Sequence, residues 1–244
     1  MYSFALKKAT VLLIGLTLTA CRTTTLLTAS FESDAVGTPP ARNLAGAPTG
    51  DSLVYQAVLE PRLRVQPAAS GTGRDLQFSQ APTTGELTPH NQWLSFKGIS
   101  TNFTQPLWFI WSATNVGGTF GGPVTIYLTD GRAGIIGGLT INGAGQVEVM
   151  TGPGNRRVIG TLRPQGVHSF IIALRPGDSQ YNISLFQTGA SAITVNDIPV
   201  FLGNMLAYAN PAKPSIDIRF ADGNDASRQY VINSASITRR QPPM

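Results

Sequence analysis

Short apolar runs that alternate with polar residues cover the chain from about residue 30 onward. In one of them Phe170, Ile172 and Leu174 fall on the same face, because successive side chains of a strand point to opposite sides. Gly, Pro, Asn and Asp separate the runs, and no long segment has helical periodicity. The pattern predicts strands at residues 53–65, 75–79, 93–99, 107–113, 124–128, 146–150, 158–162, 168–174, 181–187, 215–220 and 230–238.

Many short strands without crossover helices predict an all-β domain, built as a two-sheet antiparallel sandwich. Residues 131–145 are rich in glycine and predict a tight hairpin around Leu139 and Ile141. A phosphate-binding loop is the alternative for this segment. It requires a strand followed by a helix, with a Lys and a Ser or Thr, and the segment lacks that context.

The N-terminal segment differs from the rest of the chain. Lys7 and Lys8 precede an apolar run from Val11 to Leu18, and small residues follow it. This order is typical of an export signal, and the run is shorter than the roughly 20 residues that a spanning helix needs. We therefore expect a signal peptide at residues 1–20, a short tether at residues 21–29 and a β-sandwich domain at residues 30–240.

The sequence Leu18-Thr19-Ala20-Cys21 resembles the lipobox of bacterial lipoproteins. The resemblance implies that Cys21 is lipidated on its thiol and becomes the mature N-terminus, since two or three acyl chains anchor a protein permanently. Arg22 differs from the Asp of the enteric inner-membrane retention signal, which favours the outer membrane in a cell with two membranes. The alternative is an ordinary cleaved signal followed by a chance cysteine. Cys21 is the only cysteine, so no disulfide can form within the chain.

The charge balance of the exported part argues against nucleic-acid binding. The formal charge of +5 falls to about +3 when the signal, with its two lysines, is removed. Most arginines are scattered singly, whereas nucleic-acid binding needs a clustered basic patch. Arg239 and Arg240 form one of the few pairs, for which we weigh solvation against contact with anionic lipid headgroups.

Three segments of the mature chain resemble concanavalin A-like jelly-roll domains, the lectin, glucanase and laminin-G-like group. Residues 30–39 resemble the first strand of many secreted bacterial members, and residues 230–237 resemble the last strand, with Asn233 in place of the usual Asp. Between them, residues 166–174 and 181–185 resemble the paired central strands. The resemblance implies a jelly roll in which the first and last strands pair. The domain would then lie close to the membrane that holds Cys21.

Catalytic motifs of this group are absent from the sequence. The glucan-cleaving members carry a Glu-x-Asp-x-x-Glu run. Among the glutamates here, Glu32, Glu60, Glu86 and Glu148, only Glu32 has another carboxylate within five residues, Asp34, and solvation at a strand start explains that pair. The only histidines are His90, expected in a loop, and His168, expected to pack in the core. No Gly-x-Ser-x-Gly elbow is present. Whether the chain is an enzyme stays open, with a non-enzymatic role favoured.

Two sets of residues are candidates for ligand binding. Trp93, Trp108 and Trp111 are candidate platforms for a sugar ring, although core packing explains them as well. In residues 107–111, Leu107, Phe109 and Trp111 face one way and Trp108 faces the other.

Calcium is the one metal that the sequence suggests. Asp222, Asn224 and Asp225 place hard oxygen ligands in one turn, as in the calcium-binding loops of lectin-like sandwiches. A plain Asp-Gly turn explains the same residues, and no other cofactor is expected.

Three functions remain from the sequence. The first is a membrane-anchored jelly-roll domain that binds a glycan or has a structural role in the envelope. The second is a glycoside hydrolase-like enzyme whose carboxylate pair forms only in space. The third is a subunit of an envelope assembly with a protein partner.

Overall fold

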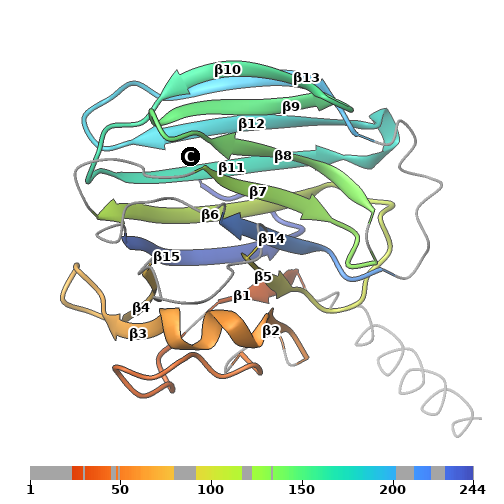
Figure 1. Cartoon of the computed structure of the whole chain (residues 1–244). Coiled ribbons are helices and arrows are strands. Elements are labelled where there is room, and N and C mark those ends of the chain that lie inside the picture. The colour runs from red at the N-terminus through yellow and green to blue at the C-terminus, as the bar shows by residue number, and fades with distance from the viewer. Residues whose placement is uncertain are drawn as a thin grey trace, which may run out of the picture.

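Two antiparallel β-sheets pack face to face in this protein (Figure 1). The computed structural model describes residues 24–29, 31–44, 48, 50–79, 92–116, 123–132, 134–201, 212–220 and 229–243. Within these ranges no helix has the length and apolar character needed to cross a membrane. The predicted all-β sandwich is confirmed.

The eight-stranded sheet has the order β13-β12-β11-β6-β15-β4-β3, and β1 also pairs with β15. Its strands are β1 (Thr25–Thr28), β3 (Leu63–Pro67), β4 (Arg74–Ser79), β6 (Leu107–Val116), β11 (Val167–Arg175), β12 (Gln180–Gln187), β13 (Ile193–Pro199) and β15 (Gln229–Thr238).

The seven-stranded sheet has the order β10-β9-β8-β7-β14-β5-β2. Its strands are β2 (Ser52–Tyr55), β5 (Gln92–Lys97), β7 (Val124–Thr129), β8 (Ile135–Ile141), β9 (Gln146–Gly152), β10 (Asn155–Thr161) and β14 (Ser215–Phe220). Two short 3₁₀ helices, η1 (Ala57–Arg62) and η2 (Pro176–Asp178), lie between strands.

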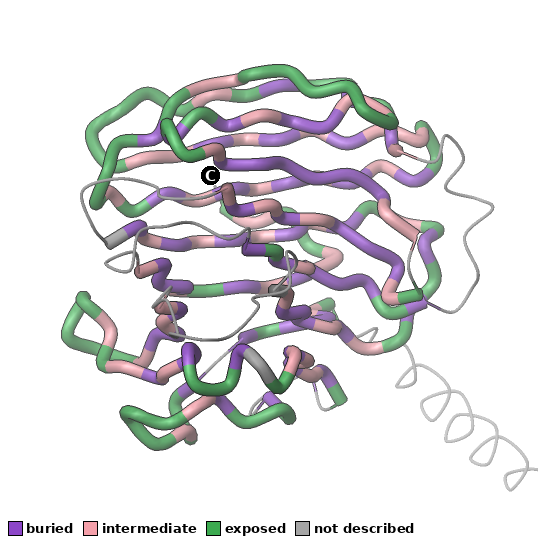
Figure 2. Tube along the Cα trace, viewed as in Figure 1, coloured by how far each residue is buried: buried purple, intermediate pink, exposed green. Residues whose placement is uncertain are grey.

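The core lies between the sheets and contains aromatic side chains from both. Buried and exposed positions alternate along the strands, as Figure 2 shows. Phe78 of β4 stacks on Phe220 of β14 with ring centroids 3.8 Å apart, and Trp111 of β6 meets Phe96 of β5 edge to face at 5.8 Å. Each buried ring of this size contributes about 1.5–3 kcal/mol. Since a single cysteine cannot form a disulfide within the chain, the fold is stabilised by core contacts of this kind.

A tyrosine and a glycine fix the distance between the sheets near β8. Tyr181 of β12 crosses the core and donates a 2.6 Å hydrogen bond to the carbonyl of Met150 on β9. Its ring lies over Gly137 of β8, where a Cβ atom would stand only 2.6 Å from the ring. Glycine is therefore required at this position for the two sheets to approach as they do.

A buried polar chain links three of the aromatic side chains. Trp111 Nε1 donates to the Tyr230 hydroxyl at 3.3 Å, and that hydroxyl lies 3.0 Å from His168 Nε2. His168 is fully buried, and burial lowers its pKa to about 4. The prediction that His168 packs in the core is confirmed.

The first strand begins earlier than the sequence indicated. β1 lies inside residues 21–29, the predicted tether, and pairs with β15, so the tether prediction is wrong for residues 25–28. Residues 31–38 form turns instead of the expected opening strand, with Phe31 buried against Phe96. Both Leu26 and Leu27 are buried, which removes the alternation that would have revealed β1. The expected pairing of the first and last strands is nevertheless present.

The other predicted strands are confirmed. The structure has two further strands, β8 and β13, and the strand predicted at residues 53–65 is two strands. Residues 53–65 contain β2, η1 and β3, because Pro61 lies inside the segment and cannot donate to a ladder. β8 and β13 were not predicted as strands. The glycine-rich segment does form a hairpin, from β8 to β9, closed where Asn142 Oδ1 accepts the N–H groups of Ala144 and Gln146.

Candidate binding face on the seven-stranded sheet

The outward side of the seven-stranded sheet carries polar and aromatic side chains, and we call it the polar face. In β14, Ile216, Ile218 and Phe220 are buried in the core, so Asp217 and Arg219 point outward. The polar face consists of Trp93, Ser95, Lys97, Thr125, Tyr127, Thr129, Thr140, Glu148, Arg156, Asp217 and Arg219.

Strand pairing arranges these residues in rows across the sheet. Arg219 lies opposite Trp93 on one side and Thr125 on the other, and the row continues through Thr140 to Glu148. The next row contains Ser95, Asp217 and Tyr127. Adjacent strands are about 4.8 Å apart, so the face from β5 to β10 extends roughly 24 Å. That length accommodates several linked sugar rings.

A groove of about 230 Å³ lies at the β5–β14 side of the polar face. Asp217 stands in it and accepts a hydrogen bond from the Ser95 hydroxyl, with the Thr129 hydroxyl 3.5 Å from its other oxygen. Lys97 and Arg219 complete the charged lining. Burial raises the pKa of Asp217, whereas the Ser95 bond and the charges of Lys97 and Arg219 lower it.

Two aromatic rings flank the charged residues of this groove. Trp93 lines the groove itself, and the guanidinium of Arg219 lies 4.8 Å from the centre of the Tyr127 ring. This cation–π contact holds Arg219 over the sheet, although its side chain is exposed. The groove thus combines a flat apolar surface with a fixed acceptor and a fixed donor.

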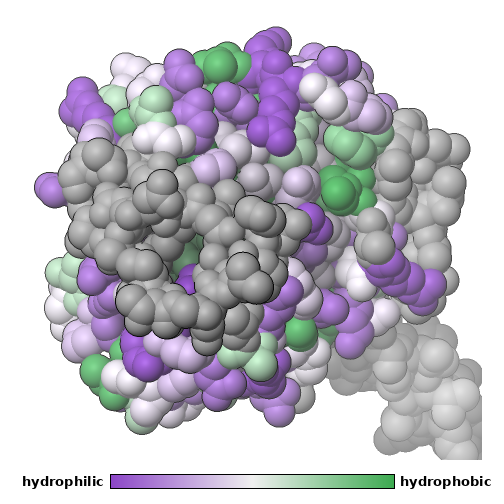
Figure 3. All heavy atoms as spheres, viewed as in Figure 1, coloured by the Kyte–Doolittle hydropathy of each residue, from purple (hydrophilic) through white to green (hydrophobic). Residues whose placement is uncertain are grey.

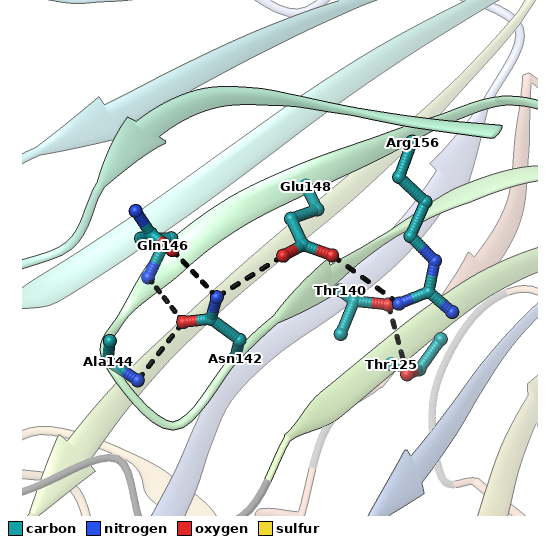
Figure 4. Close-up of polar contacts among 7 residues, drawn as sticks. All are labelled: Thr125, Thr140, Asn142, Ala144, Gln146, Glu148 and Arg156. Atoms are coloured by element: carbon teal, nitrogen blue, oxygen red, sulfur yellow. Dashed lines mark hydrogen bonds and ion pairs between the residues drawn. The ribbon is translucent and has the colours of Figure 1, made fainter.

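A second polar cluster continues the face toward β10 (Figure 4). Asn142 Nδ2 donates a hydrogen bond of 3.2 Å to Glu148 Oε1, and Arg156 Nη1 lies 3.5 Å from Glu148 Oε2. Thr125 and Thr140 bond to each other at 3.1 Å beside this pair. β10 is the edge strand, and Figure 3 shows mostly hydrophilic side chains along the top of the molecule, where Figure 1 places it.

The structure separates the three tryptophans that the sequence proposed as platforms. Trp93 lies on the polar face. Trp108 is half-buried on the outward side of the eight-stranded sheet, on the opposite side of the sandwich. Trp111 is only 3% exposed and packs between Phe96 and Tyr230, so the core explanation holds for it and the platform assignment does not.

The proposed metal and lipid residues lie outside the described residues. These are Asp222, Asn224 and Asp225 for calcium and Cys21 for the lipid, and His90 falls outside as well. Within the described ranges no group of three or more His, Cys, Asp or Glu side chains is placed to hold a metal ion. Calcium binding at the Asp222–Asp225 turn stays a prediction.

Neither of two carboxylate pairs that share a surface, Asp217 with Glu148 and Glu32 with Asp75, forms a hydrolase pair in an aromatic cleft. Asp217 and Glu148 share the polar face but stand three strands apart, about 14 Å, which exceeds the separation in either class of glycosidase. Glu32 and Asp75 both line a hollow on the other sheet that contains no aromatic side chain. Asp75 there accepts a 3.0 Å bond from Asn233.

Sequence reasoning missed most of the groove. Ser95, Lys97, Tyr127, Thr129, Asp217 and Arg219 were not singled out. The alternation of residues 215–220 does place Asp217 and Arg219 on the solvent side of a strand, and that signal was available. What the sequence does not reveal is that β14 lies between β5 and β7, which brings Trp93 and Tyr127 to either side of these charges.

Comparisons with known proteins identify the architecture. No protein-family description and no curated protein matches the chain. Among solved structures, winged bean acidic lectin superposes with a TM-score of 0.53 at 9% identity, covering 86% of this chain and 97% of the lectin. The fold is a lectin-type jelly roll.

Two further structures give the same result over part of larger proteins. The binding domain of botulinum neurotoxin serotype D/C has a TM-score of 0.55 at 6% identity, with 90% of this chain and 50% of the neurotoxin domain covered. A sialidase has a TM-score of 0.51 at 13% identity over 88% of this chain, which spans only 18% of the sialidase. Identities this low show the shared fold alone.

Proposed function

We propose that this protein is a glycan-binding module held at the bacterial cell envelope by a lipid on Cys21, and that the polar face is its binding surface. The groove around Asp217 carries the proposal, because it offers the three contacts that a sugar requires. Trp93 supplies a flat apolar surface for the C–H face of a pyranose ring. Asp217 accepts hydrogen bonds from hydroxyls, and Arg219 donates them.

The fixed geometry of these groups supports binding over a purely structural role. Ser95 and Thr129 hold the Asp217 carboxylate in place, and Tyr127 supports Arg219, so little side-chain entropy is lost when a ligand is bound. A partly buried carboxylate whose pKa is raised by burial, set in a groove beside Lys97 and Arg219, is a frequent feature of functional sites.

Ligands of the similar structures agree with this proposal. The winged bean lectin was solved with methyl-α-D-galactose, and a binding domain of a botulinum neurotoxin was solved in complex with SialylT. Those ligands belong to those proteins. They show that the same architecture can carry sugar sites, and they suggest the ligand class to test first.

The anchor is the second part of the proposal. The motif ending in Cys21 precedes β1 by only four residues, so the folded domain begins within about 14 Å of the lipid. Arg22 favours sorting to an outer membrane where the cell has two membranes. Mass spectrometry of the mature protein tests this part, and we expect an N-terminal diacylglyceryl cysteine. A mature N-terminus at any other residue would contradict the anchor and leave the glycan site untouched.

A glycan array probed with residues 21–244 tests the binding site, since this chain contains every strand of both sheets. We expect binding to a restricted set of glycans that is abolished in Trp93→Ala and in Asp217→Ala. Trp108→Ala is the matched control, because it removes the same side chain from the opposite side of the sandwich. Binding that survives both groove variants, or no binding to any glycan, would contradict the assignment.

A further inference from the structure

The outward side of the eight-stranded sheet carries an apolar patch at its centre, formed by Trp108, Ile110, Ile171 and Ala173, and we call it the Trp108 patch. Ile110 of β6 lies opposite Ile171 of β11, and Trp108 lies opposite Ala173. All four are half-buried. Phe186 of β12 extends the patch by one row.

This side of the sandwich has a different charge pattern from the polar face. The outward residues of β6, β11, β12 and β15 in the rows from Trp108 to Ser112 are Ser, Thr, Asn and the apolar patch residues, so none of these described positions is charged. The polar face, by contrast, carries Lys97, Glu148, Arg156, Asp217 and Arg219. A central region without charged side chains around a partly exposed aromatic ring suits contact with an apolar surface.

The N-terminal strand connects the Trp108 patch to the proposed anchor. Thr25 of β1 pairs with Thr238 of β15, and Thr238 pairs with Trp108, so the three lie in one row. Two strand spacings, about 10 Å, separate Thr25 from Trp108. Three residues separate Cys21 from Thr25, so the four residue steps between them add a further reach of at most about 14 Å. A lipid on Cys21 would therefore enter the bilayer beside this face, at its Trp108 end.

Basic and apolar groups at the same end fit the headgroup region of a bilayer. Arg240 and Pro242 line a groove of about 880 Å³ with Thr25 and Thr238, next to the row of Trp108. Tryptophan favours the membrane interface, and a basic residue near the surface is attracted by anionic lipids. At the adjoining corner Arg175 is paired with Asp178 and Asp197.

We propose that the Trp108 patch rests on the lipid bilayer into which Cys21 is anchored. This inference rests on the proposed anchor and adds an orientation to it. The two sheets form opposite sides of one sandwich, so the polar face then points away from the membrane, toward whatever glycan the envelope or its surroundings present. The membrane-bound orientation would keep the Asp217 groove accessible.

The single cysteine allows a test that does not depend on lipidation in the cell. Residues 21–244 are coupled through Cys21 to a maleimide lipid in vesicles of phosphatidylcholine and phosphatidylglycerol whose acyl chains carry bromine near the headgroup. Bromine quenches tryptophan fluorescence at short range. We expect clear quenching in the parent protein, loss of at least half of it in Trp108→Phe, and no loss in Trp93→Phe.

Each other outcome would overturn the orientation. Quenching that disappears in Trp93→Phe would place the polar face on the bilayer, and equal quenching in all three proteins would mean no fixed orientation. Sedimentation of the uncoupled protein tests whether a second copy of the chain occupies the Trp108 patch instead. A dimer that Trp108→Phe weakens would assign the patch to a second copy of the chain. Failure of the cellular anchor alone shows only in the mass of the mature N-terminus and leaves this test intact.

Discussion

Buried His168 makes the stability of this protein sensitive to mild acid. Its Nε2 atom lies 3.0 Å from the Tyr230 hydroxyl, which itself accepts the Nε1–H of Trp111. Because the indole can only donate, the hydroxyl hydrogen of Tyr230 is available to Nε2, and the imidazole is neutral there. A proton on Nε2 would remove this hydrogen bond and place a charge in the core.

The size of the effect follows from the pKa of His168. Burial lowers it from 6.5 to about 4 in the folded protein, while the unfolded chain keeps the ordinary value. Between these two pH values the unfolded state binds more protons, so the free energy of unfolding falls as the pH falls. The loss begins near pH 6.5 and is complete below pH 4. A difference of about 2.5 pKa units corresponds to roughly 3 kcal/mol.

Urea unfolding of the parent protein and of His168→Gln, from pH 7.5 down to pH 4, measures this loss. Glutamine does not titrate, and its amide oxygen can still accept from Tyr230. We expect the stability advantage of the parent over His168→Gln to shrink by roughly 3 kcal/mol across the range. Burial raises the pKa values of Asp51 and Asp217, so these two groups lower the stability of the protein as the pH rises. They are present in both proteins, and their effect cancels in the difference. A difference that stays constant with pH would refute the reasoning.

Three further predictions concern packing, the groove and the metal. Gly137→Ala pushes a methyl group into the Tyr181 ring and should lower the free energy of unfolding by about 1–3 kcal/mol in urea titrations, whereas Gly177→Ala, which has open space, should leave it unchanged. Asp217→Asn removes a carboxylate that burial disfavours in its charged form, so its melting temperature relative to the parent should be higher at pH 7 than at pH 3.5; the reverse order would contradict the raised pKa. Calcium, if bound as the sequence predicts, should release heat on titration and raise the melting temperature, and both effects should vanish in Asp225→Ala; no heat and no shift would exclude the site.

The sequence predicted the architecture better than it predicted the site. Alternation is a local property, so strands such as β11, β12 and β14 could be found from their own residues. β1 escaped because four residues with two adjacent buried leucines show no period, and β13 escaped because a bulge at Asp197 places its buried residues, Val195 and Ile198, three positions apart. The pairing of the first and last strands came from the resemblance to jelly rolls and was confirmed by β1 and β15.

The groove could not be predicted because it depends on which strands become neighbours. Trp93, Asp217 and Tyr127 come from β5, β14 and β7, three strands far apart in the sequence. Alternation shows that each points outward, but only the sheet order places them side by side. The same limit applied to the tryptophans, since the alternation that separated Trp108 from Trp111 did not say which of them faces the core.

Calorimetric titration with the glycan selected on the array tests the central claim most directly. Trp93→Ala and Trp108→Ala differ from the parent by the same deleted ring, on opposite sides of the sandwich. Loss of one stacking contact and its buried area predicts at least a tenfold rise in Kd for Trp93→Ala, equivalent to about 1.4 kcal/mol, and no change for Trp108→Ala. An unchanged Kd in Trp93→Ala, or a rise confined to Trp108→Ala, would contradict a glycan site on the polar face.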